Sequence, residues 1–261
     1  MQATTMPLSG KRILVTRSAG QAMSLSKKLR YLGAITIEIP TIEIRPPPDF
    51  DPIDDSIRNL SGYDWIIFTS VHAVDFFFRR MGILQVPVSA LGLLRIAAIG
   101  SATSSAIERA GRKPDYVPSD FLSERIAIGL GELRGKRVLL PRADIASKNL
   151  PLLLRDKGAS VDEIVAYETV PPRKLNFDRL RVVLNSGVDI VTFTSPSTVR
   201  NFANAVGHTD VGRFLSNARV VCIGPVTAEA ARDLGINVNV VARPHTIDAL
   251  VEAIVSDIRN L

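Results

Sequence analysis

With 261 residues, the chain is long enough for one large domain or for two domains of about 130 residues. Its 46% hydrophobic and 22% charged residues exclude a disordered or fibrous protein, and no apolar stretch reaches the ~20 residues that a membrane span needs. The net charge of +6 fits an anionic partner. Because basic residues are scattered and aromatic residues make up only 6%, we expect a small polyanion rather than nucleic acid, although a merely basic surface explains the charge equally well.

Short apolar segments alternate with helical patterns along the chain. In chain order, strands are expected at 13–16, 65–69, 96–99, 138–140, 190–194 and 220–223. The helices between them include 23–32, 103–110, 150–157 and 227–234, several of which are followed by glycine, as is typical of a helix end. Because the strand segments are continuously apolar, they fit a parallel sheet covered on both faces. The alternation predicts βαβ units and an α/β fold.

Two extended segments, 37–44 and 163–170, interrupt this alternation, and each leads into a proline cluster. Prolines stiffen connections and often mark domain boundaries. We therefore expect one domain at 48–161 and another assembled from both chain ends, 1–38 and 173–261. The linker strands are then 39–47 and 162–172.

An internal repeat runs through the chain. Three segments recur in the same order, 10–17 as 135–142, 64–70 as 189–195, and 95–100 as 219–224. The offset is 125 residues for the first two pairs and 124 for the third. Such ordered self-similarity indicates that the chain is a duplication.

Familiar catalytic and cofactor motifs are missing from the sequence. It contains no G-x-G-x-x-G, no G-x-x-x-x-G-K-[ST] and no H-E-x-x-H, and its three histidines match no triad spacing. The single Cys222 excludes an internal disulfide, and its apolar surroundings predict a core thiol. We expect neither a metal nor a cofactor. The first residues lack the apolar core of a secretory signal, so we expect a cytoplasmic protein.

Hydroxyl groups and glycines follow four of the expected strands. They are Thr69 and Ser70, Gly100 and Thr103, Ser195 and Ser197, and Gly224 and Thr227. Each site alone is explained as a helix cap, because Ser and Thr are preferred at that position. Together, however, they place four helix N-termini at the carboxyl edges of parallel strands, where α/β proteins bind ligands. Such edges suit a ligand with several carboxylates.

Four features of the sequence occur together: the paired halves, the Phe-Thr-Ser motifs at 68–70 and 193–195, the two Gly-x-x-Thr motifs, and the segment Ala166-Tyr167-Glu168-Thr169. In these features the chain resembles the uroporphyrinogen-III synthase family. The resemblance covers about residues 10–254. It implies two flavodoxin-like domains with parallel sheets, joined by a two-stranded β linker. It also implies an enzyme that needs no cofactor or metal. Nothing in the sequence indicates a pairing surface, so we expect a monomer.

By this resemblance, the substrate would be hydroxymethylbilane, a linear tetrapyrrole with an acetate and a propionate on every ring. The enzyme would eliminate water, invert ring D through a spiro intermediate and close the macrocycle to uroporphyrinogen III, which feeds haem, sirohaem and cobalamin biosynthesis. The family's matching tyrosine is proposed to assist departure of the substrate hydroxyl, which assigns Tyr167 as the catalytic residue. The repeat places Ile42 at the equivalent position of the first half. A linker aromatic that packs against a domain is the structural alternative.

The remaining candidates would bind the acetate and propionate groups through hydroxyls and backbone amides. They are Thr69, Ser70, Gly100, Thr103, Ser195, Ser197, Gly224 and Thr227. Arg17 and Arg142 end equivalent strands and would pair with carboxylates, although surface salt bridges explain them equally well; Lys148 is a weaker candidate. Val71-His72 stands where the second half has Pro196-Ser197, so the two Thr-Ser sites need not contribute equally.

Two other functions are weighed against the enzyme. Duplicated α/β lobes also suit an intracellular, non-catalytic binder of a small polyanion. A catalytically inactive regulatory copy of the synthase is the second alternative. Loss of Tyr167 or an added DNA-binding domain would indicate such a copy, and the sequence shows neither sign.

Overall fold

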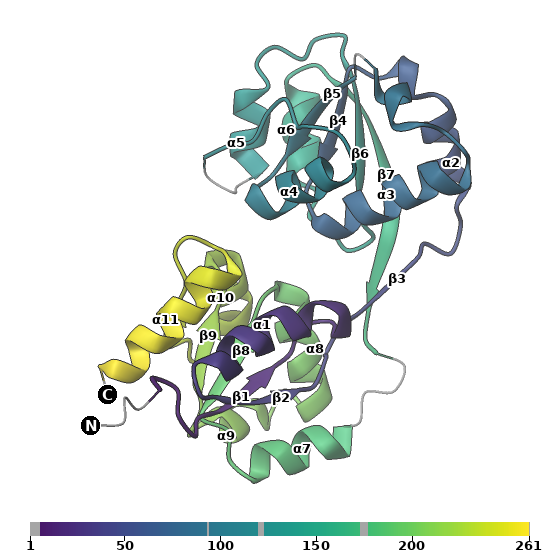
Figure 1. Ribbon diagram of the computed structural model, residues 1–261. Coiled ribbons are helices and arrows are strands. Elements are labelled where there is room, and N and C mark those ends of the chain that lie inside the picture. Colours follow the sequence, from purple (N-terminus) through teal and green to yellow (C-terminus); the bar gives the residue numbers. More distant parts are fainter. Residues whose placement is uncertain (1–5, 93, 120–122, 173–176, 261) are drawn as a thin grey trace. The chain divides into compact units, whose positions relative to one another are not determined.

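The computed structural model describes residues 6–92, 94–119, 123–172 and 177–260, and it divides into two α/β units (Figure 1). The terminal unit contains both chain ends, up to Glu43 and from Val170 onward, and the central unit contains Ile44–Thr169. The chain therefore passes from one unit to the other at two places. Both places fall inside the segments 39–47 and 162–172 that the proline clusters single out.

Parallel strands form the sheet of the terminal unit, in the order β10-β9-β8-β1-β2. The strands are β1 (Arg12–Val15), β2 (Ile35–Glu38), β8 (Ile190–Phe193), β9 (Arg219–Cys222) and β10 (Val240–Val241). The helices are α1 (Ala19–Tyr31), α7 (Phe177–Asn185), α8 (Pro196–Val206), α9 (Val211–Leu215), α10 (Pro225–Asp233) and α11 (Ile247–Arg259). Helices α1 and α11 cover one face of the sheet, and α7 to α10 cover the other.

The central unit has the sheet order β3-β7-β6-β4-β5, with β4 to β7 paired in parallel. Its strands are β3 (Glu43–Arg45), β4 (Trp65–Phe68), β5 (Arg95–Ala98), β6 (Arg137–Ala143) and β7 (Ser160–Val170). Its helices are α2 (Asp51–Arg58), α3 (Val71–Ile83), α4 (Ser101–Arg109), α5 (Ser123–Gly129) and α6 (Asn149–Asp156), with short 3₁₀ turns at Leu60–Gly62 and Val88–Leu91. Within the described ranges, no helix is both long and apolar enough to cross a bilayer.

Both faces of each sheet are buried, which confirms the predicted α/β class. Along β4, Ile66 and Phe68 join the core under α2, α3 and α4, whereas Trp65 and Ile67 join the core under α5 and α6. A strand whose two faces are both covered needs an unbroken apolar run, and this explains why no polar residue alternates along it.

The two units repeat one strand order and several of its polar contacts. The order β7-β6-β4-β5 of the central unit corresponds to β2-β1-β8-β9 of the terminal unit. The Asp64 carboxylate accepts a hydrogen bond from the Arg137 amide at 2.9 Å, and Asp189 accepts the equivalent bond from Arg12 at 2.7 Å. In each unit this hydrogen bond joins the first residue of β6 or β1 to the residue just before the neighbouring strand, β4 or β8.

The structure departs from expectation in the segment 37–44, which forms two short strands instead of one. Strand β2 ends at Glu38 and β3 begins at Glu43. Between them lies Pro40, which has no amide hydrogen to offer to a sheet. The next residue, Thr41, is buried, and its hydroxyl donates to the carbonyl of Thr198 at 3.0 Å. This contact holds the chain against the terminal unit before it leaves for the central one.

Strand β6 is longer than expected, ending at Ala143 although Pro141 lies within it. Its neighbour β4 pairs only with Val138 and Leu139, so the proline lies beyond that pairing. The extension makes Arg142 part of the strand.

The predicted helix-terminating glycines include Gly33 and Gly158, which adopt φ values of +95° and +84°.

A buried ion pair ties α2 to α3. Arg80 donates to both oxygens of the Asp54 carboxylate, with 2.6 Å between its Nη2 and Oδ2. The Asp54 side chain is only 6% exposed, and the Arg80 guanidinium lies over the Phe50 ring, 4.3 Å from its centroid. The hydrogen bonds from Arg80 hold the pKa of Asp54 below its ordinary value of 3.8 although burial opposes this.

We predict that Asp54→Asn lowers the free energy of unfolding by about 3 kcal/mol at pH 7, because it leaves a guanidinium without its buried partner. The folded-state pKa of Asp54 is depressed, so this contribution is present above pH 3.8 and is lost as the pH falls through the folded value. Urea denaturation measures both effects. The control is Asp55→Asn, which alters an exposed carboxylate of the same helix and is expected to change stability by less than about 0.5 kcal/mol. Equal losses in the two variants would contradict the assignment.

Candidate active site

Strand-to-helix turns of each unit lie at the carboxyl edge of its sheet, because the strands are parallel. At two of these turns a serine caps the following helix. The Ser70 side chain accepts a hydrogen bond from the Ala73 amide at 3.1 Å, and Ser195 accepts one from the Thr198 amide at 3.2 Å. Ser197 lies beside this second cap, with its Oγ 2.9 Å from that of Ser195. The serines therefore do serve as caps, and they also bring hydroxyl groups to the edge.

Glycine replaces the capping serine at the turns that begin α4 and α10. Gly100 and Gly224 are both extended, so the backbone conformation itself does not require glycine there. At Gly224 space is tight, because a Cβ atom would lie 3.1 Å from the ring of His245 and that ring would have to shift. Thr103 and Thr227 follow in the first helical turns and are 4% exposed. Both helices thus begin without a capping side chain, which leaves their first amides for a ligand.

Tyr167 reaches the carboxyl edge of the central unit from β7. Its hydroxyl donates to Ser70 Oγ at 3.0 Å, which joins the predicted catalytic residue to a predicted binding residue. The ring stacks on Phe76 with 6.0 Å between centroids, and His72 packs edge-on against it at 5.5 Å. Tyr167 is 7% exposed. Its packing partners come from α3, so the helix capped by Ser70 also holds the phenol in place.

Burial raises the pKa of Tyr167 above the ordinary value of 10, and the hydrogen bond with Ser70 only partly opposes this. The side chain is therefore a neutral phenol at physiological pH. A neutral phenol keeps a proton that it can donate, so this site supplies an acid rather than a base.

A β-bulge gives Tyr167 this orientation. Arg142 pairs with Val165 across β6 and β7, but the next residue, Ala143, pairs with Tyr167, so Ala166 is an extra residue. Val165 is exposed and both Ala166 and Tyr167 are buried. Without the extra residue, Tyr167 would continue the exposed face of Val165.

Arg17 is an uncompensated cation at the carboxyl edge of the terminal unit. Its Nη2 donates to Gln21 Oε1 at 2.8 Å, and its Nε is buried without a hydrogen-bond partner. Among the described residues, no carboxylate forms an ion pair with it, and burial lowers its pKa to about 10. Arg17 is half-buried, and a guanidinium in such a position without a counter-ion is stabilised when an anion binds to it.

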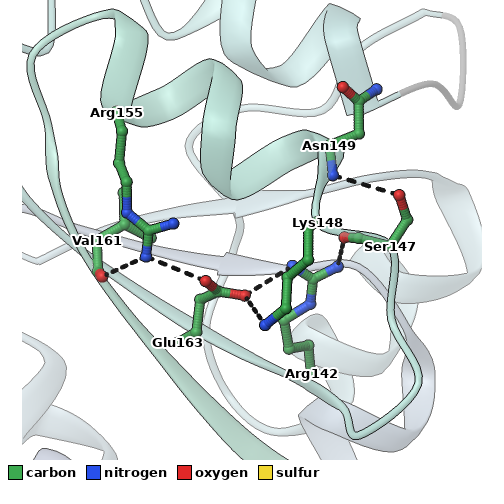
Figure 2. A network of polar contacts seen from close by, with 7 residues as sticks. All are labelled: Arg142, Ser147, Lys148, Asn149, Arg155, Val161 and Glu163. Carbon is green, nitrogen blue, oxygen red and sulfur yellow. Dashed lines mark hydrogen bonds and ion pairs between the residues drawn. The ribbon is translucent and has the colours of Figure 1, made fainter.

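Arg142, the equivalent residue of the central unit, lies in a cationic cluster with Lys148, Arg155 and the carboxylate of Glu163 (Figure 2). Glu163 Oε2 lies 3.3 Å from Arg142 Nη1 and 3.0 Å from Lys148 Nζ, and its Oε1 lies 3.0 Å from Arg155 Nη2. Burial acts to raise the pKa of Glu163, but the hydrogen bonds from Lys148 and Arg155 outweigh it and the pKa falls. Three cations around one carboxylate leave an excess of positive charge.

The sequence-predicted residues therefore gather at two edges. The central unit brings together Thr69, Ser70, Gly100, Thr103, Arg142 and Tyr167, and the terminal unit brings together Arg17, Ser195, Ser197, Gly224 and Thr227. Sequence reasoning missed Glu163 and the contact of His72 with Tyr167. The spacing of His72 and Phe76, four residues apart on α3, was the available signal for the second of these. Cys222 is buried in the core, which raises its pKa to about 12 and leaves it outside the site.

Comparison with known proteins shows which family this chain is similar to. Residues 23–252 match the family model described as uroporphyrinogen-III synthase HemD. The uroporphyrinogen-III synthase of Synechococcus elongatus is 34% identical over 253 residues, covering 95% of this chain and 96% of that protein. That of Chlorobaculum parvum is 30% identical over 254 residues, covering 94% and 99%. A crystal structure of a mutant uroporphyrinogen III synthase from Thermus thermophilus has the same fold, with a TM-score of 0.70 at 19% identity, covering 97% of this chain and all of that one.

The different surroundings of the two arginines generate a stability prediction. In a buffer without multivalent anions, Arg17→Met leaves the free energy of unfolding unchanged or raises it by about 1 kcal/mol, because it removes a half-buried charge that has no carboxylate partner among the described residues. Arg142→Met lowers it by about 2 kcal/mol, because Arg142 hydrogen bonds Glu163 and the Ser147 carbonyl. Chemical denaturation of the two variants measures the contrast. Equal losses would show that Arg17 is a structural residue rather than one held ready for an anion.

Proposed function

The chain belongs to the uroporphyrinogen-III synthase family, and on this premise we propose that it converts hydroxymethylbilane into uroporphyrinogen III in tetrapyrrole biosynthesis. The linear substrate loses water, ring D is inverted through a spiro intermediate, and the macrocycle closes. The main structural support is the neutral Tyr167 phenol, hydrogen bonded to Ser70 at the carboxyl edge of the central unit.

In the proposed mechanism, Tyr167 donates its proton to the departing hydroxyl of the substrate, which leaves as water. Ring D releases a proton when the macrocycle closes, and that proton restores the phenol. The enzyme thus ends the cycle unchanged, and the steps require proton transfer and positioning alone. Positioned acid catalysis contributes about 10²–10⁴-fold to a rate. Packing against Phe76 and the hydrogen bond to Ser70 hold the phenol for this step.

The remaining candidate residues bind the acetate and propionate groups of the substrate in this proposal. Helix N-termini bind carboxylates through free amides and a positive dipole end, which suits the glycine-capped helices α4 and α10. We assign the hydroxyls of Thr69, Ser70, Thr103, Ser195, Ser197 and Thr227, and the amides that follow Gly100 and Gly224, to these groups. Arg17 gains a counter-ion when a substrate carboxylate binds, and the cluster around Arg142 provides positive charge at the other edge. We also propose that the protein acts as a monomer in the cytoplasm.

The activity is tested by the isomer of the product. Porphobilinogen and its deaminase generate hydroxymethylbilane in the assay, which left alone closes without inversion to isomer I. After oxidation, uroporphyrins I and III are separated by chromatography. We expect isomer III in proportion to added protein. Isomer I alone, from protein shown to be folded by circular dichroism, would refute the synthase and leave the two-lobed polyanion binder as the alternative.

The role of Tyr167 is tested by Tyr167→Phe, which keeps the ring and removes the proton donor. We expect turnover to fall at least tenfold while the melting temperature changes little, because the packing on Phe76 is retained. The matched control is Tyr63→Phe. Tyr63 also donates a hydrogen bond, to Asp162 at 2.8 Å, but it lies before β4 at the opposite edge of the sheet. A wild-type rate in Tyr167→Phe would remove this residue from the mechanism.

A further inference from the structure

We propose that Lys148 is the cation of the central unit that contacts a substrate carboxylate, and that Glu163 and Arg142 are positioning residues that hold Lys148 in place. This inference rests on the proposed function. It reverses the order that the sequence suggests, in which Arg142 is the stronger candidate and Lys148 the weaker one.

The contacts of Arg142 turn its guanidinium toward the protein. Its side chain is 8% exposed, its Nη1 donates to Glu163, and its Nη2 donates to the carbonyl of Ser147 (Figure 2). Its Nε is buried and has no hydrogen-bond partner. A side chain with these contacts has little surface to offer to a ligand. It does, however, fix the residue that directly precedes Lys148.

Lys148 is far more accessible to solvent than Arg142, because its side chain is 73% exposed. An ammonium group has three N–H donors, and the contact with Glu163 Oε2 at 3.0 Å uses one of them. The others remain for a carboxylate. Lys148 also lies at the N-terminus of α6, where the chain leaves the carboxyl edge of β6.

The backbone on both sides of Lys148 is anchored. Arg142 binds the carbonyl of Ser147, and Ser147 Oγ accepts a hydrogen bond from the amide of Asn149 at 3.3 Å. With the ammonium held by Glu163 as well, Lys148 loses much of the rotamer freedom that makes surface lysines weak binders. Such freedom costs up to about 2 kcal/mol to remove, and a side chain held in advance does not incur that cost on binding.

Comparison of the two units supports the division of roles. The contact of Arg155 with Glu163 has its equivalent in the terminal unit, where Arg30 contacts Glu38 at 2.8 Å. The equivalents of Arg142 and Lys148 are Arg17 and Met23. Among the described residues, Arg17 has no carboxylate partner, and Met23 is an exposed apolar residue. The repeat therefore places a lysine at this position only in the unit whose arginine contacts a glutamate.

The first test measures the KM for hydroxymethylbilane in the isomer III assay. We expect Lys148→Ala to raise KM about tenfold, which corresponds to about 1.4 kcal/mol of binding. The kcat should stay within about twofold, because Lys148 is not assigned to the chemical step. Lys148→Arg is expected to restore most of the affinity. The matched control is Lys113→Ala, which removes the same charge from an exposed residue after α4, at the amino edge of the same unit.

Glu163→Gln separates positioning from charge by the sign of its effect. Removal of a negative charge by itself would strengthen binding of an anion and lower KM. Loss of the anchor for Lys148 raises KM, by about fivefold on our proposal. If Glu163 acts through Lys148, this rise disappears when Glu163→Gln is made in the Lys148→Ala background. A lower KM, or an equal rise in both backgrounds, would show that Glu163 does not position Lys148.

The outcomes also distinguish this inference from the function on which it rests. Isomer I alone from the wild-type protein overturns the proposed function and this inference with it. Isomer III from the wild-type protein, together with an unchanged KM in Lys148→Ala, overturns only the inference.

Discussion

Parallel strand pairing is the constraint on which both units depend. A parallel strand cannot return by a tight turn, so the chain must cross over through a helix each time, and every crossover begins at the same edge of the sheet. That edge therefore collects the first turns of α3 and α4 in the central unit and of α8 and α10 in the terminal unit. Their unpaired amides are a product of the fold itself. The helices differ in the residue before their first turn, which is a capping serine in α3 and α8 and a glycine in α4 and α10.

The two units share this scaffold but differ in the chemistry placed on it. A phenol stands at Tyr167, whereas the residue 125 positions earlier is the buried Ile42. A similar difference separates Arg17 from Arg142, since within the described ranges only the second forms an ion pair with a glutamate. The two units therefore share one architecture and carry different side chains at their carboxyl edges.

Much of the fold follows from the sequence because its signals are local. Continuous apolar segments predicted the strands to within a few residues. The chain changes units after Glu43 and after Thr169, close to the two proline clusters. The resemblance to a known family predicted the function, and the comparisons support it.

The details of the site depend on register, which local signals do not contain. The bulge that turns Tyr167 inward is a one-residue shift between β6 and β7, and only the pairing of the two strands shows it. The same is true of Glu163, whose contacts with Arg142 and Lys148 join residues 21 and 15 positions away. A sequence pattern ranks single residues by type, whereas the burial of Arg142 and the exposure of Lys148 arise from the packing around them.

The assembly of the terminal unit from both chain ends has a consequence for synthesis on the ribosome. The Arg12 amide bonds to Asp189, which is added 177 residues later. At about 5–20 residues per second, β1 waits roughly 10–35 s for β8, while the central unit is already complete as a continuous stretch of chain. The central unit therefore folds first, as an insertion within an unfinished neighbour. During that interval β1 can pair with β2 but not with β8, and the apolar face of α1 lacks α11, which completes its core. Residues 12–38 are therefore the part of this nascent unit most in need of protection from aggregation.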